Sequence, residues 1–141
     1  MTITLLEFGA EVSLFMVAIS GLSLAWRGGD AWFGSRDRRW FALAFAILAI
    51  VALAHGSGAI EAEAFLVLTR SLGAILLAVA AIACSTDAEE RATLLVGAFL
   101  LEVGGLLTLA EDERAGFGII AAGALVVGTA LGLAGRRSLV V

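Results

Sequence analysis

Residues 60–84 form an apolar run that contains a single basic residue, Arg70. A helix rises about 1.5 Å per residue, so the run is long enough to cross a bilayer and places Arg70 about 15 Å from its first residue. A charge at that depth is costly and normally faces a partner or water. The run therefore predicts a membrane helix whose buried guanidinium needs an acidic neighbour.

The composition of the whole chain indicates the same class. Hydrophobic residues make up 61% of the 141 residues, and the mean hydropathy is +1.04. This is more apolar side chain than the core of one small soluble domain can hide. Further runs of about 20 apolar residues are typical of membrane helices, which satisfy every backbone polar group within one segment. We therefore predict an all-α integral membrane bundle.

Five spans are expected within a single transmembrane domain that covers residues 1–141, at about residues 3–26, 40–55, 60–84, 92–110 and 115–135. The first span carries Glu7 and Glu11 near its start and no basic residue. A secretory signal would begin with basic residues. We therefore expect an uncleaved helix there.

The distribution of arginine predicts the orientation. Seven of the nine basic residues, all of them Arg, fall in the first loop, in the third loop and at the C-terminus, which alternating helices place on one side. The other side holds only Arg114. Short cytoplasmic loops carry an excess of basic residues. We therefore expect a multi-pass protein of the cell membrane with its N-terminus outside and its C-terminus in the cytoplasm.

With this topology the charged residues of the spans gather in the outer half of the membrane. The candidate intramembrane polar cluster consists of Arg70, Glu11, Glu102 and Glu7, and the candidate outer rim consists of His55, Glu61 and Glu63. Helical side chains lean toward the N-terminus of their own helix, which favours Glu11 as the partner of Arg70. The short loop between the third and fourth spans favours Glu102 instead. A site shared by both acids is a third option.

The polar cluster has two interpretations. An arginine with one acid can be an interhelical clamp that holds the bundle together. It can also be a site for a solute or an ion. Gly128-xxx-Gly132 predicts a close helix contact, either within the chain or between subunits.

Other function classes have little support in the sequence. One histidine and one cysteine do not suggest a metal centre, and we expect no cofactor. Motifs for nucleophilic or metal-dependent catalysis and for phosphate binding are missing, which argues against an enzyme. No basic face is present for nucleic acid.

These features predict a small membrane protein that acts as a structural or accessory subunit through lateral helix contacts. Its partners would be the lipid bilayer and either further copies of the chain or a larger membrane protein. The alternative is a transporter of a small solute or an ion, coupled to protons, with an outward-facing polar pocket around Arg70. A third option is a membrane sensor module.

Overall fold

The computed structural model describes residues 5–27, 38–57, 63–84, 88–109 and 113–140, and each of these segments forms one helix. The helices are α1 (Leu5–Arg27), α2 (Arg38–Gly56), α3 (Glu63–Cys84), α4 (Ala88–Leu109) and α5 (Glu113–Val140). All five are long and apolar enough to cross a membrane. The prediction of an all-helical chain with five such helices is confirmed, and it is compatible with a multi-pass membrane protein.

The helices extend beyond several of the expected spans. α4 begins at Ala88, four residues before the expected start, because its first turn uses the charged segment that contains Glu89 and Glu90. Acidic residues are favourable in the first turn of a helix, where the backbone N–H groups lack partners. Hydropathy therefore predicts only the apolar part of a helix. The backbone hydrogen bonds of the helix continue into the polar residues beside that part.

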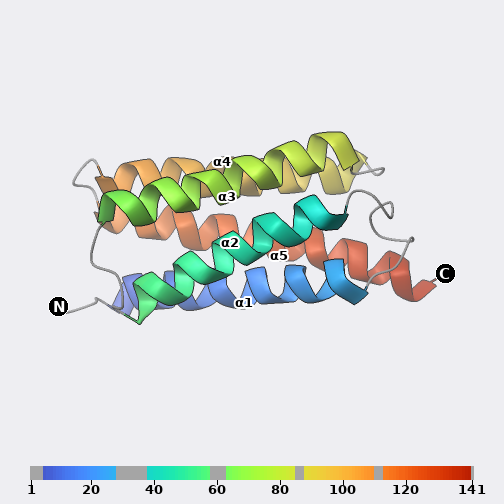
Figure 1. Ribbon diagram of the computed structural model, residues 1–141, viewed down its shortest axis with the longest axis horizontal. Coiled ribbons are helices and arrows are strands. Elements are labelled where there is room, and N and C mark those ends of the chain that lie inside the picture. The colour runs from blue at the N-terminus through green and yellow to red at the C-terminus, as the bar shows by residue number, and fades with distance from the viewer. Residues whose placement is uncertain (1–4, 28–37, 58–62, 85–87, 110–112, 141) are drawn as a thin grey trace.

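The five helices form a closed ring. Each helix packs against the next one in the sequence, and α5 also packs against α1 (Figure 1). Neighbours in sequence are antiparallel, so the odd number of helices makes α1 and α5 run in the same direction. The starts of α1, α3 and α5 and the ends of α2 and α4 therefore lie together (Figure 1), and we call this end of the molecule the N-terminal end.

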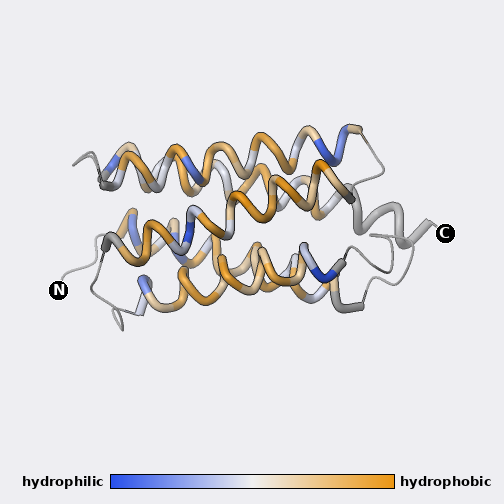
Figure 2. Tube along the Cα trace, turned by 45° about the horizontal axis from the view of Figure 1, so that its top comes forward, coloured by the Kyte–Doolittle hydropathy of each residue, from blue (hydrophilic) through white to orange (hydrophobic). Residues whose placement is uncertain are grey.

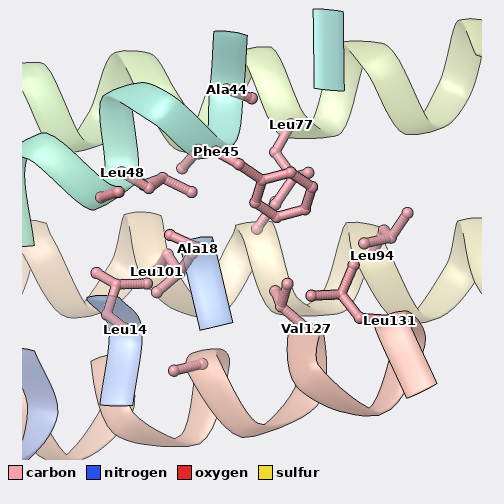
Figure 3. Close-up of a cluster of buried hydrophobic side chains, with 14 of the residues drawn as sticks. Leu14, Ala18, Ala44, Phe45, Leu48, Leu77, Leu94, Leu101, Val127 and Leu131 are labelled. Carbon is pink, nitrogen blue, oxygen red and sulfur yellow. The ribbon is translucent and has the colours of Figure 1, made fainter. Parts of the chain in front are cut away.

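Apolar side chains from all five helices fill the interior of the ring (Figure 3). The largest of the fully buried side chains include Leu14, Phe45, Leu48, Leu77 and Leu101. The outer surface is also apolar along the middle of the helices, and hydrophilic residues are found mainly toward the two ends (Figure 2). A bundle that is apolar both inside and outside suits a surrounding of lipid.

The seam between α4 and α5 is formed by glycines with a spacing of seven residues. They are Gly97 and Gly104 on α4, and Gly116 and Gly123 on α5. Cβ atoms built on these glycines would all lie closer than ordinary van der Waals contact to the facing helix. The two backbones therefore approach directly, and this helix pair makes the most extensive contact in the molecule. Sequence analysis did not single out these four glycines.

The predicted packing motif lies elsewhere, along the pair formed by α1 and α5. A Cβ atom on Gly128 would lie 3.5 Å from Val17 of α1, an ordinary contact, and one on Gly132 would meet nothing within 4 Å. Both glycines line a groove of about 380 Å³ together with Met16, Val17, Ser20, Leu24 and Leu131. Among the described residues, Gly128 and Gly132 therefore border an open groove between two helices rather than a tight seam.

Candidate functional site

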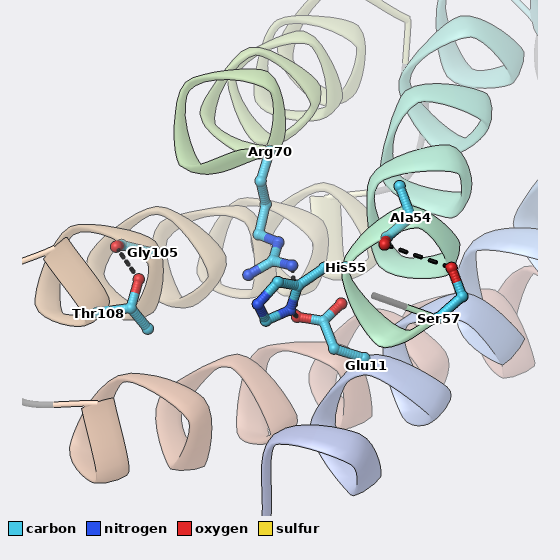
Figure 4. Close-up of polar contacts among 7 residues, drawn as sticks. All are labelled: Glu11, Ala54, His55, Ser57, Arg70, Gly105 and Thr108. Carbon is cyan, nitrogen blue, oxygen red and sulfur yellow. Dashed lines mark hydrogen bonds and ion pairs between the residues drawn. The ribbon is translucent and has the colours of Figure 1, made fainter. Parts of the chain in front are cut away.

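Three side chains from three helices meet near the N-terminal end of the bundle (Figure 4). Arg70 of α3 donates from Nη2 to Oε1 of Glu11 on α1, at 2.5 Å. Nδ1 of His55 on α2 lies 2.9 Å from the same oxygen. The exposed fraction is 1% for Glu11, 3% for Arg70 and 8% for His55. We call these three residues the triad.

The directions of the helices explain why the triad forms. Glu11 and Arg70 lie about 9 and 10 Å beyond the first residues of α1 and α3, and their side chains lean back toward the N-terminal end. His55 belongs to the last turn of α2, which runs the opposite way, so its side chain leans into the bundle. The side chains of Glu11 and Arg70 thus extend toward the N-terminal end while that of His55 extends away from it, and the three polar groups meet.

Two further contacts hold the triad in place. The ring of Phe117 on α5 stacks on the His55 ring, with centroids 5.6 Å apart and an interplanar angle of 7°. A Cβ atom on Gly56 would lie 3.4 Å from Cβ of Glu11, so the end of α2 packs directly against α1. The imidazole is thus held by the carboxylate of Glu11 at its edge and by the ring of Phe117 against its face.

The hydrogen bonds of the triad all fall on one oxygen of the carboxylate. Oε1 of Glu11 is the acceptor for both Arg70 and His55, whereas Oε2 is buried without a hydrogen-bond partner among the described residues. Nε of Arg70 is also buried without one. An ionised carboxylate beside a guanidinium forms a formally neutral pair, but each of these charged groups keeps unused hydrogen-bonding capacity.

Glu102 belongs to a second polar contact, beside the triad. The hydroxyl of Ser71 on α3 lies 2.6 and 2.7 Å from the two carboxylate oxygens of Glu102 on α4. Successive helical residues point about 100° apart, so Arg70 faces α1 while Ser71 faces α4. Of the two candidate partners of Arg70, the structure joins Glu11 to it and gives Glu102 a hydroxyl donor.

The remaining candidate acids are outside the triad. Glu7 is partly buried on α1, one turn closer to the N-terminal end than Glu11. Glu61 and the side chain of Glu63 lie outside the described residues. Within the described part of the chain, no three His, Cys, Asp or Glu side chains are grouped as metal ligands would be.

A pocket of about 190 Å³ lies between α1 and α2 beside the triad. Its lining is apolar apart from two residues, Glu11 and Ser57; the others are Phe8, Val12, Phe15, Ala52, Leu53 and Gly56. Ser57 is exposed at the end of α2. The pocket therefore connects the neighbourhood of the buried carboxylate with the N-terminal end of the bundle.

Sequence reasoning placed His55 at the rim and did not connect it with Glu11. The structure shows the imidazole buried and in contact with the carboxylate. The available signal was the position of the only histidine in the last turn of an apolar helix, where the side chain leans inward. Ser71 was missed as well, although it directly follows Arg70.

Comparison of the chain with protein-family models, curated proteins and solved structures finds no match.

Proposed function

We propose that this protein is a structural or accessory subunit of a membrane assembly and acts through lateral helix contacts. One observation carries the proposal: Arg70 contacts Glu11 and Glu102 contacts Ser71 between helices of the bundle, while large apolar side chains face outward on all five helices. The most exposed of them on α2 to α5 include Ile50, Leu68, Phe99 and Leu125. Inside a membrane, such a surface offers neighbours shape and packing rather than charge.

The triad supports this proposal as an internal clamp. It connects α1, α2 and α3 through one buried carboxylate. Interhelical polar contacts of this kind hold membrane bundles together. Apolar side chains fill the interior of the bundle beyond the triad.

The groove between α1 and α5 is the proposed lateral contact. Gly132 has open space around it, and Ser20 and Gly128 add two more small residues to the same groove. Small residues allow the backbone of a neighbouring helix to come close, which strengthens packing where lipid gives no hydrophobic driving force. The expected occupant is an apolar helix of another membrane chain.

A leucine scan of open glycines on α5 tests this proposal. Gly132→Leu should fill the groove and release the partner, while the matched Gly118→Leu, also with nothing within 4 Å of its Cβ position, should not. Native mass spectrometry of the protein in nanodiscs prepared from its own membrane measures the retained chains. Retention of the same assembly by both variants, or a wild-type protein that carries lipid alone, would contradict the proposal.

The alternative is transport of a small solute or an ion. It is favoured by one feature, the pocket between α1 and α2 that reaches Glu11. This alternative predicts a flux in proteoliposomes that contain this chain alone, and Glu11→Gln should abolish that flux. A structural subunit predicts no flux without its partner.

A further inference from the structure

We propose that the pocket between α1 and α2 binds a small uncharged alcohol, whose hydroxyl donates a hydrogen bond to Oε2 of Glu11. The pocket is separate from the groove between α1 and α5 that is proposed for the lateral partner, because the two share no lining residue. The inference therefore holds whether or not such a partner exists. It gives a role to the one carboxylate oxygen that the clamp leaves unused.

Small residues on α2 leave the space for this pocket. Ala52 and Gly56 both line it and are one helical turn apart, so they lie on the same face of α2. The wall on the side of α1 is formed by Phe8, Val12 and Phe15. The volume of about 190 Å³ suits a body of about one ring, since an apolar cavity of about 150 Å³ can hold benzene.

Glu11 is the only charged residue that lines the pocket. Its Oε1 is taken by Arg70 and His55, whereas Oε2 is buried without a hydrogen-bond partner among the described residues. Figure 4 shows this second oxygen turned away from the side chains of Arg70 and His55. A buried acceptor without a hydrogen bond is costly, so a donor that reaches Oε2 gains a contact for which no described residue competes.

The surroundings of Oε2 select an uncharged donor. The carboxylate already forms an ion pair with Arg70, so a cation at Oε2 would be repelled by the nearby guanidinium. An anion is disfavoured because no basic residue lines the pocket and Oε2 is itself an acceptor. Water needs two to four polar partners, and the lining is apolar apart from Glu11 and Ser57. A hydroxyl on an apolar body satisfies both the oxygen and the apolar wall.

The ligand enters from the outer surface of the bundle. Phe8, Val12 and Leu53 all line the pocket and are exposed, so the pocket is open where molecules dissolved in a membrane arrive. Oε2 is buried, and the carboxylate must turn slightly to meet the hydroxyl. The terminal dihedral of a glutamate is broad, which allows this turn while Oε1 stays with Arg70.

NMR of the full chain in nanodiscs tests the proposal with four probes of similar size. Benzyl alcohol donates a hydrogen bond, acetophenone only accepts one, ethylbenzene does neither, and benzylammonium is a cation. The amide signals of Gly56 and Ser57 report binding, and each probe is compared at equal concentration within the bilayer. We expect a saturable shift with benzyl alcohol and an affinity for ethylbenzene that is lower by about tenfold or more, as for the loss of a hydrogen bond to a charged group.

Three results with the wild-type protein would overturn the proposal. Equal affinities for ethylbenzene and benzyl alcohol would show that Oε2 takes no part in binding. Tighter binding of benzylammonium would show a cation site. Displacement of benzyl alcohol by an equal concentration of diacylglycerol would show that a lipid, and not a small alcohol, occupies the pocket.

A pair of variants tests the location of the site. Val12→Phe should fill the pocket and weaken the binding of benzyl alcohol by about tenfold or more, the effect of losing a well-packed ligand contact. Val79→Phe makes the same change at an exposed position of α3 outside the pocket and should leave binding unchanged. Equal affinities of the two variants would contradict this location.

Glu11→Gln tests the role of the oxygen itself. Because Arg70 can only donate, the amide oxygen should take the place of Oε1, and the amide nitrogen then replaces Oε2 as a donor. The preference should therefore shift from benzyl alcohol toward acetophenone. An unchanged preference would overturn the proposal, and the wild-type probes and the valine variants decide it equally if Glu11→Gln does not fold.

Discussion

Gly104 of α4 and Gly116 of α5 lie against each other so closely that neither can carry a side chain without meeting the other. A Cβ atom on either glycine would come within 2.8 Å of the carbonyl oxygen of the other. The obstacle is backbone on both sides, so a rotamer change cannot relieve it. The α4–α5 seam therefore has no room for a side chain at either glycine.

Gly104→Ala is therefore expected to destabilise the bundle. Overpacking of a well-packed interior typically costs about 1–3 kcal/mol, more than the up to about 1 kcal/mol by which alanine favours a helix over glycine. Thermal unfolding in detergent measures the effect, with Gly118→Ala as control because its Cβ position is open. Equal melting temperatures for the two variants would contradict a tight seam.

Removal of Arg70 should weaken the bundle and leave a buried carboxylate with His55 as its remaining partner. We expect Arg70→Ala to cost about 3 kcal/mol or less, because polar contacts in membrane proteins are weaker than buried ion pairs in soluble ones. Adding Glu11→Ala should recover part of this loss, whereas adding Glu102→Ala should not. Chemical unfolding of the single and double variants measures the coupling of Arg70 to each acid. Recovery of stability with Glu102→Ala would show that Arg70 pairs with Glu102 rather than with Glu11.

Ser71→Ala should have a smaller effect than Arg70→Ala, although the two residues are adjacent. It removes one hydroxyl that bonds a partly exposed carboxylate on α4. Interhelical hydrogen bonds in membrane proteins average about 0.6 kcal/mol, so a loss of about 1 kcal/mol or less is expected. In a double-mutant cycle Ser71→Ala should couple to Glu102→Ala and not to Glu11→Ala. The reverse result would rule out separate contacts for Arg70 and Ser71.

The predicted orientation can be measured by cysteine labelling on a Cys84→Ala background. An impermeant reagent should label Ser57→Cys and Asp112→Cys in intact cells, because the scarcity of arginine predicts that these loops are outside. Ser35→Cys, in the arginine-rich first loop, should react only after permeabilisation. Labelling of Ser35→Cys in intact cells would reverse the orientation or change the number of spans.

The sequence by itself determined that there are five helices and at which depth each charge lies along its helix. Both follow from local properties: the length of an apolar run, and a fixed rise per residue. The depth of Glu11 and Arg70 and the lean of their side chains already favoured their contact. A different argument, the short loop between the third and fourth spans, favoured Glu102 instead.

Only the tertiary structure decided between the two acids, because the choice depends on the rotation of each helix about its own axis. In a soluble protein, the apolar stripe of a helix shows which face is buried. Here the outer face is apolar as well, as Leu68 and Leu72 on the exposed side of α3 illustrate. The sequence therefore contains little information about which way Arg70, Ser71 or His55 points. Contacts formed between the helices, such as the close packing of Gly56 on α2 against Glu11 on α1, accompany the rotations that bring the triad together.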